Sequence, residues 1–165
     1  AKLPPAFVKD GGTVTAGNAS GINDGAGAVV LMSEGRARKE GIRPLGRIVK
    51  YGISGVDPAY MGYGPVPSSR MALERAGMSV KDIELWEINE AFSAQYLYCE
   101  RELGVDPEIT NIWGGAVAYG HPVGATGARL VTTTLEALKD QDKTIGLATL
   151  CIGGGQGMAM ILERL

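Results

Sequence analysis

The sequence lacks the features that mark several classes of protein. Basic residues are not in excess, with 16 Lys and Arg against 18 Asp and Glu, and no basic stripe interleaves with aromatic residues, so we expect no nucleic-acid partner. No apolar run approaches the roughly 18 residues of a membrane-spanning helix, and the opening residues do not have a signal-peptide pattern. The two cysteines, Cys99 and Cys151, lie far apart and fit reduced thiols. We therefore expect a cytoplasmic protein without a membrane partner.

Glycine, by contrast, is abundant, at 25 of 165 residues. This is about twice the average usage, without a collagen period, and the glycines cluster where elements end. Such a distribution indicates tight turns and close approach of the backbone to a ligand. Small residues crowd around the only histidine, His121, in the stretch from Asn111 to Gly127.

The N-terminal residues differ in composition from the remainder. The chain begins at Ala1 without an initiator Met, in a stretch that contains Pro4 and Pro5. We interpret residues 1–12 as a linker from a missing N-terminal half of a longer protein. The remainder, residues 13–165, is predicted to form a single domain.

Hydrophobic patterns predict strands that alternate with helices and end in two adjacent strands, in the order β-α-β-α-β-α-β-β, in which the third α stands for two successive helices. Strands are expected at 26–32, 45–56, 83–88, 144–150 and 156–162, and helices at 34–40, 68–76, 91–103 and 124–139. Apolar residues throughout 26–32 favour a strand buried on both faces. The glycine turn after Cys151 is so short that it predicts an antiparallel hairpin. We therefore expect an α/β fold with a mixed, mostly parallel five-stranded sheet covered by helices.

Reactive side chains stand at the junctions between these elements. Asn89 follows one predicted strand, Cys151 ends another, and His121 precedes a predicted helix. Because α/β folds place their chemistry at strand ends, these residues are candidates for one site. Cys99 falls on the apolar stripe of helix 91–103 and is predicted to be structural.

Four motifs give the sequence a resemblance to a known family. They are Asn89-Glu90-Ala91-Phe92, Gly120-His121-Pro122, Cys151-Ile152-Gly153-Gly154-Gly155, and the stretch from Thr15 to Gly25. In this order and spacing they resemble the C-terminal half of a thiolase, the acetyl-CoA acetyltransferase family. The likeness extends from Ala6 to Leu162.

The resemblance implies a role for each matching residue. Cys151 matches the acid/base cysteine, and His121 and Asn89 match an oxyanion site for the enolate of acetyl-CoA. Gly153 matches a glycine whose backbone N–H belongs to a second oxyanion site. Ser20 and Phe92 match positions that bind the pantetheine arm of coenzyme A. Coenzyme A thioesters are then substrates, so we expect no cofactor and no metal.

The resemblance also implies partners for the chain. The acyl-accepting cysteine of thiolases lies in the N-terminal half, so this chain alone is expected to be inactive and to need that half. A homo-oligomer, dimer or tetramer, is expected of the intact protein. From their positions, Glu90 and Asp24 are predicted to be structural, and Arg129 to be a solvated or inter-subunit charge.

One position departs from the family pattern. Trp113 stands where the family usually has the second asparagine of Asn-x-Asn-Gly-Gly-Ala, which removes hydrogen-bonding capacity and adds bulk beside the histidine loop.

Alternative functions remain open at this level. A degradative 3-ketoacyl-CoA thiolase of broader chain length, or a non-catalytic scaffold that keeps the motifs, fits the same residues. A ketoacyl synthase is disfavoured because only one histidine exists. A nucleotide-binding loop is excluded, since no glycine loop is followed by Lys-Ser or Lys-Thr.

Overall fold

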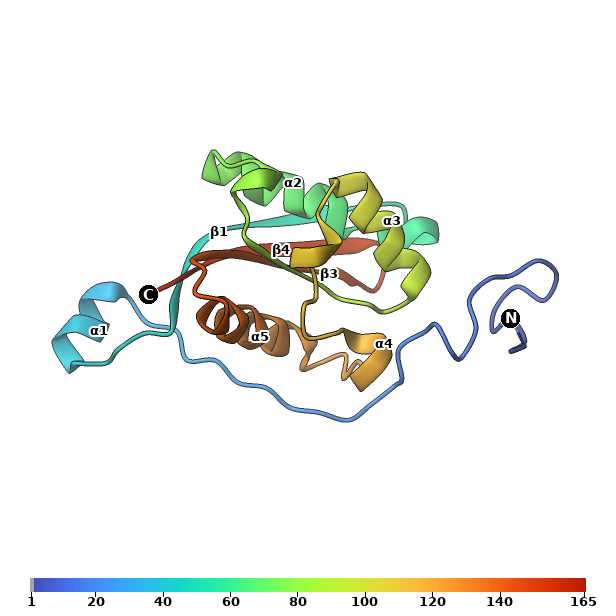
Figure 1. Ribbon diagram of the computed structural model, residues 1–165, viewed down its shortest axis with the longest axis horizontal. Helices are drawn as coiled ribbons and strands as arrows, with labels where there is room; N and C mark the ends of the chain where they lie inside the picture. Colours follow the sequence, from blue (N-terminus) through green and yellow to red (C-terminus); the bar gives the residue numbers. More distant parts are fainter. Residues whose placement is uncertain (1) are drawn as a thin grey trace.

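The computed structural model describes residues 2–165 and has a four-stranded sheet at its centre (Figure 1). The strands are β1 (Gly46–Gly55), β2 (Leu85–Ile88), β3 (Ile145–Ile152) and β4 (Gln156–Arg164), in the spatial order β1-β4-β3-β2. Strand β4 pairs antiparallel with both β1 and β3, whereas β2 pairs parallel with β3. The α/β class and the closing hairpin are confirmed, but the sheet has four strands rather than five and is mostly antiparallel.

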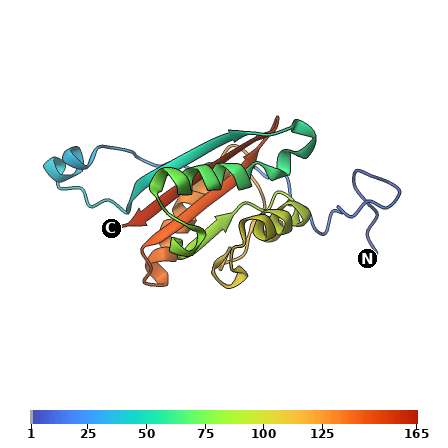
Figure 2. The ribbon, with the colours of Figure 1, turned by 90° about the horizontal axis from the view of Figure 1, so that it is seen from above.

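Helices cover both faces of this sheet (Figures 1 and 2). Helices α2 (Pro65–Ala76) and α3 (Ser93–Leu103) lie on one face, and α4 (Ala116–Tyr119) and α5 (Thr126–Asp140) lie on the other. Helix α1 (Glu34–Glu40) projects away from the sheet at the opposite end from the N-terminus. Three short 3₁₀ helices complete the described chain: η1 (Pro58–Tyr63), η2 (Val80–Asp82) and η3 (Pro107–Ile109).

The predicted first strand is the missing one. Residues 26–32 form no strand, and Val30 and Leu31 are 84% and 72% exposed. In Figure 1 this segment runs as an extended ribbon past α4 and α5 toward α1. The apolar composition favours burial but does not specify a partner. None of the strands described in residues 2–165 pairs with this segment.

The structure confirms several of the helix caps and ends that the sequence predicted. Ser33 caps α1 and Gly41 ends it in the left-handed conformation, while Ser79 and Asp82 form the predicted capping box. Helix α2 begins at Pro65 instead of 68, because proline is well tolerated in the first turn of a helix. Cys99 is fully buried, as its place on the helical stripe predicted.

Strand β2 is buried on both faces, and its alternation decides which side chains enter the site. Trp86 and Ile88 pack into the main core with residues of α2 and α3, whereas Leu85 packs against Ala137 and Leu138 of α5. Side chains two residues apart in a strand point to the same face. Glu87, and Asn89 just beyond the strand, therefore lie on the same side as Leu85, facing α5.

Candidate active site

Two predicted site residues lie at the carboxyl ends of adjacent parallel strands. Asn89 directly follows β2, and Cys151 is the second-last residue of β3. The pairing places Ile88 opposite Thr149, and the Asn89 N–H donates to the Thr149 carbonyl at 2.9 Å. The parallel pair therefore carries both residues to one edge of the sheet.

His121 reaches the same edge from the loop between α4 and α5. Its backbone N–H donates to the Gly21 carbonyl and to Asn23 Oδ1, each at 3.2 Å. Gly120 precedes it with a φ of 101°, and a Cβ at that position would lie 2.2 Å from Asn23 Oδ1. Only glycine therefore fits here, so the glycine before the histidine has a steric cause.

The imidazole ring is held at both of its nitrogens. Asn89 Nδ2 lies 3.3 Å from His121 Nε2, and Thr126 Oγ1 lies 2.7 Å from His121 Nδ1. The Thr126 hydroxyl donates to the Pro122 carbonyl at 3.0 Å, which leaves its oxygen free to accept a proton from Nδ1. This arrangement places the ring proton on Nδ1 and leaves Nε2 as an acceptor toward Asn89.

The surroundings of His121 favour the neutral ring. Burial lowers the pKa of His121 below its ordinary value, and the Arg129 charge lowers it further. A histidine that is neutral at neutral pH can take up a proton before it donates one.

The predicted residues lie around a cavity of about 430 Å³. Asn89 does not line it, but it is buried and contacts His121, which does. The lining of the cavity includes His121, Cys151, Gly153, Ser20 and Phe92. The Ser20 N–H donates to the Ala91 carbonyl at 3.0 Å, which holds the loop of Ser20 against the Phe92 segment. Phe7 packs edge-to-face on Phe92, with ring centroids 5.8 Å apart. The structure thus brings all six predicted residues together, while their catalytic roles stay predictions.

The N–H groups of the glycine turn do not lower the pKa of the Cys151 thiol. Burial raises the pKa of the Cys151 thiol, and only its own backbone N–H opposes this effect. Among residues 2–165, no side-chain hydrogen bond joins its Sγ to the N–H groups of the turn. Those glycines serve the turn itself, since Gly154 and Gly155 have φ of 79° and 80°. Cys151 therefore rests as a neutral thiol.

The sequence predicted Arg129 to be a solvated or inter-subunit charge, and so missed it as a site residue. In the structure its side chain contacts other residues of the site. Its guanidinium donates to Asn89 Oδ1 at 3.2 Å and to the Tyr119 hydroxyl at 2.9 Å. The signal was its spacing, since Arg129 lies three residues after Thr126 and shares that face of α5.

Glu87 was also missed. It is 3% exposed, and burial raises its pKa to about 7, with the Arg129 charge acting in the opposite direction. A carboxylate among the apolar residues Leu85, Trp86 and Ile88 was the signal in the sequence.

Glu90 anchors the segment that precedes His121. Its carboxylate accepts from the Val117 N–H at 3.1 Å and from Asn111 Nδ2 at 3.2 Å, in agreement with the structural role that we predicted. Trp113 is 48% exposed and does not line the cavity. Its bulk therefore points to the surface and leaves the site free.

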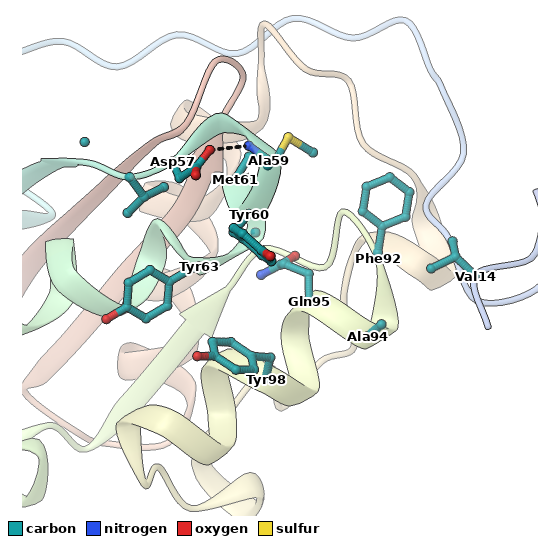
Figure 3. A pocket seen from close by; sticks show the side chains of 13 residues that line it. Val14, Asp57, Ala59, Tyr60, Met61, Tyr63, Phe92, Ala94, Gln95 and Tyr98 are labelled. Carbon is teal, nitrogen blue, oxygen red and sulfur yellow. Dashed lines mark hydrogen bonds between the residues drawn. The ribbon is translucent and has the colours of Figure 1, made fainter. Parts of the chain in front are cut away.

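A second, larger cavity adjoins the first (Figure 3). It has a volume of about 870 Å³ and shares Phe92 and Met61 with the smaller one. Figure 3 shows the side chains that line it, including those of Tyr60, Tyr63 and Tyr98. The lining is mostly apolar and aromatic, so this space suits an apolar group.

Residues 2–165 contain no group of three or more His, Cys, Asp or Glu side chains that could hold a metal ion. None of the helices described in this chain has the length and apolar character needed to cross a membrane.

The fold and the site define an α/β domain with cysteine, histidine and asparagine side chains gathered at one sheet edge. The family model of the thiolase C-terminal domain matches residues 42–164, and that of the thiolase N-terminal domain matches residues 1–35. The chain therefore belongs to the thiolase family. The N-terminal match extends beyond the linker of residues 1–12 that we predicted.

Individual relatives agree with this assignment. The acetyl-CoA acetyltransferases of Rhizobium meliloti (strain 1021) and Escherichia coli (strain K12) are 60% and 59% identical to this chain. They match 100% and 99% of it, but the chain spans only 42% and 41% of their length.

Solved structures of longer relatives contain the same fold. The crystal structure of the Bacillus anthracis acetyl-CoA acetyltransferase matches 99% of this chain and 41% of its own, with 52% identity and a TM-score of 0.96. Human mitochondrial 3-ketoacyl-CoA thiolase in complex with CoA gives a TM-score of 0.96 at 51% identity, with the same coverage of the two chains.

Proposed function

We propose that this chain is the C-terminal part of an acetyl-CoA acetyltransferase, which joins two acetyl-CoA molecules into acetoacetyl-CoA and catalyses the reverse thiolysis. The observation that carries the proposal is the convergence of Cys151, His121 and Gly153 on one cavity, with Asn89 bonded to His121. The names of the Rhizobium meliloti and Escherichia coli relatives support it.

In the cleavage direction, the N-terminal half supplies a nucleophilic cysteine. His121 Nε2 accepts the proton of that thiol, and the resulting thiolate attacks the ketone carbon of acetoacetyl-CoA. The carbon–carbon bond breaks, which leaves an acetyl group on the cysteine and the enolate of acetyl-CoA. The imidazolium of His121 and the amide of Asn89 stabilise the enolate oxygen.

Cys151 completes the reaction as acid and then as base. Its neutral thiol, favoured by burial, gives a proton to the enolate carbon and releases acetyl-CoA. The thiolate of Cys151 next takes the proton of incoming coenzyme A, whose sulfur attacks the acetyl group on the nucleophile. The Gly153 N–H stabilises the oxyanion of that step. A second acetyl-CoA leaves, and the released thiolate of the nucleophilic cysteine takes its proton back from the His121 imidazolium.

A degradative 3-ketoacyl-CoA thiolase is the second candidate. The 870 Å³ cavity next to the site favours it, since Phe92 and Met61 border both spaces and an acyl chain longer than acetoacetyl could extend between them. The likeness to the human mitochondrial 3-ketoacyl-CoA thiolase supports the same reading.

The remaining proposals concern the intact protein. We infer a homo-oligomer, a role in fatty acid metabolism and a cytoplasmic location. The exposed apolar side chains of Ile22, Val30 and Leu31 support an interface on this chain. The two free cysteines fit a reducing compartment.

The decisive experiment measures coenzyme A-dependent cleavage of acetoacetyl-CoA by the purified chain, alone and mixed with a separately expressed thiolase N-terminal half. We expect activity only in the mixture, and its loss in the Cys151→Ala variant. Cys99→Ala is the matched control, because it removes a buried thiol that does not line the cavity and should leave turnover intact. A longer 3-ketoacyl-CoA, tested in parallel, distinguishes the two candidate enzymes.

Two results would contradict the proposal. Activity of the chain alone would show that it does not need a nucleophile from another half. An inactive mixture in which both halves are folded and bound to each other would favour the scaffold alternative.

A further inference from the structure

Arg129 is wedged between the histidine loop and the end of β2. One terminal nitrogen donates to the Tyr119 hydroxyl at 2.9 Å, and the other donates to Asn89 Oδ1 at 3.2 Å. The guanidinium also lies over the Tyr119 ring, with its central carbon 4.9 Å from the ring centroid. Tyr119 is held in turn, since its hydroxyl donates to the Gly114 carbonyl at 2.8 Å.

These contacts select one orientation of the Asn89 amide. An asparagine side chain presents an oxygen acceptor at one end and an NH₂ donor at the other, and the two ends can exchange by rotation. Arginine can only donate, so the amide oxygen must face Arg129. The NH₂ group then faces His121 Nε2.

The orientation of the amide affects the protonation state of the imidazole. An NH₂ group facing Nε2 requires a lone pair there, which is the tautomer with its proton on Nδ1, facing Thr126. If the amide turned round, its oxygen would favour a proton on Nε2. His121 would then be poorly suited to accept a proton from a thiol.

We propose that Arg129, clamped by Tyr119, is a positioning residue that fixes the Asn89 amide and thereby keeps His121 Nε2 free to accept a proton. The importance of this step for turnover rests on the proposed function. The orientation of the amide and the tautomer of the ring do not.

The charges around Arg129 agree with a held position. The Arg129 charge lowers the pKa of Glu87 on β2, whereas Glu90, just after that strand, raises it. The same three charges also affect the pKa of Tyr119 on α4. Arg129 Nε is buried without a hydrogen-bond partner in the described chain. A buried donor without a partner is unfavourable, which indicates that the two terminal contacts determine where this side chain lies.

The test uses nuclear magnetic resonance on the 165-residue chain. His121 is the only histidine, so its ring nitrogens give one unambiguous set of signals. The nitrogen chemical shifts report the tautomer, and a pH titration reports the pKa. The variants are Arg129→Met, which removes charge and donors, and Arg129→Lys, which keeps the charge but cannot contact Tyr119 and Asn89 with a planar fork.

We expect Arg129→Met to raise the pKa of His121 and to move the ring proton from Nδ1 toward Nε2. Arg129→Lys should also change the tautomer, because charge alone does not orient the amide. Arg101→Met, at an exposed arginine of α3, is the matched control and should change neither property. Tyr119→Phe removes the hydroxyl clamp and should shift the tautomer in the same direction without loss of charge.

A wild-type tautomer in Arg129→Lys would overturn the positioning role and leave only an electrostatic one. A wild-type tautomer and titration in Arg129→Met would overturn both. If Arg129→Met fails to fold, Arg129→Lys and Tyr119→Phe still decide the question.

The activity readout separates this inference from the proposed function. In the reconstituted mixture, Arg129→Lys should lower kcat roughly 10- to 100-fold with little change in KM, less than the loss expected when an oxyanion donor itself is removed. An unchanged kcat would contradict the inference. If the Arg129 variants shift the tautomer but the reconstituted wild-type mixture cleaves no thioester, the proposed function is contradicted. The positioning of Asn89 by Arg129 is then still supported.

Discussion

At the scale of single residues, a buried carboxylate lies close to the chemistry. Glu87 shares its strand face with Asn89, two residues further along the chain, and it interacts with the Arg129 charge. Its pKa is raised to about 7 by burial, from an ordinary value of 4.5. Between these two values the folded chain binds a proton that the unfolded chain lacks, so Glu87 makes the free energy of unfolding fall as pH rises.

We therefore expect Glu87→Gln to remove that dependence. Relative to wild type, the variant should gain stability steadily from about pH 4.5 to pH 7, and the gain should level off above that range. The total change is at most about 3.5 kcal/mol, because each pKa unit corresponds to about 1.4 kcal/mol. Urea unfolding at several pH values measures it, with the exposed Glu74→Gln as the control. A difference between wild type and Glu87→Gln that stays constant from pH 5 to pH 7 would contradict this account.

At the scale of elements, the sheet and α2 approach each other at two glycines. A Cβ on Gly157, at the start of β4, would lie 2.0 Å from the Gly64 carbonyl oxygen, which precedes α2. Gly157 also stands opposite Cys151 in the β3–β4 register. Close packing of backbone on backbone therefore holds the end of the site in place.

Gly157→Ala should lower the free energy of unfolding by roughly 1–3 kcal/mol, because the added methyl group forces β4 and α2 apart. Gly55→Ala is the matched control: this glycine ends β1, pairs with the same strand, and has open space around its Cβ position. Thermal and urea unfolding give the comparison. Equal stability of the two variants would show that this contact is not tight in solution.

At the scale of the whole molecule, the chain exposes apolar side chains of a kind that proteins usually bury in a core or an interface. Val30 and Leu31 are 84% and 72% exposed, in a segment whose composition favours burial on both faces. This segment lies within residues 1–35, which match the thiolase N-terminal domain. Exposed apolar patches of this kind mark interaction sites.

Val30→Lys should reduce self-association of the isolated chain and weaken its binding to an N-terminal half, while the free energy of unfolding changes by less than about 0.5 kcal/mol. Analytical ultracentrifugation measures the association, and urea unfolding measures the stability. Lys39→Ala, at an exposed position of α1, is the control for a change of surface charge. If Val30→Lys associates as wild type does, this segment is not the interface.

The local sequence was sufficient for most elements and for the members of the site. Caps at Ser33 and Gly41 delimited α1, and the apolar stripe through Cys99 predicted the buried face of α3. The four motifs named six residues, and the structure places five of them on one cavity with Asn89 directly behind. These features depend on neighbours within a few residues, which the sequence displays.

Only the tertiary structure decided the antiparallel pairing of β1 with β4, the lack of a fifth strand in the described sheet and the contacts of Arg129. Strand pairing is made by hydrogen bonds between segments far apart in the chain. Residues 26–32 have the composition of a strand, but they pair with no strand within residues 2–165. Arg129 contacts Asn89 across 40 positions of sequence. Whether a charged side chain meets water or an amide depends on what packs over it, and no local pattern contains that information.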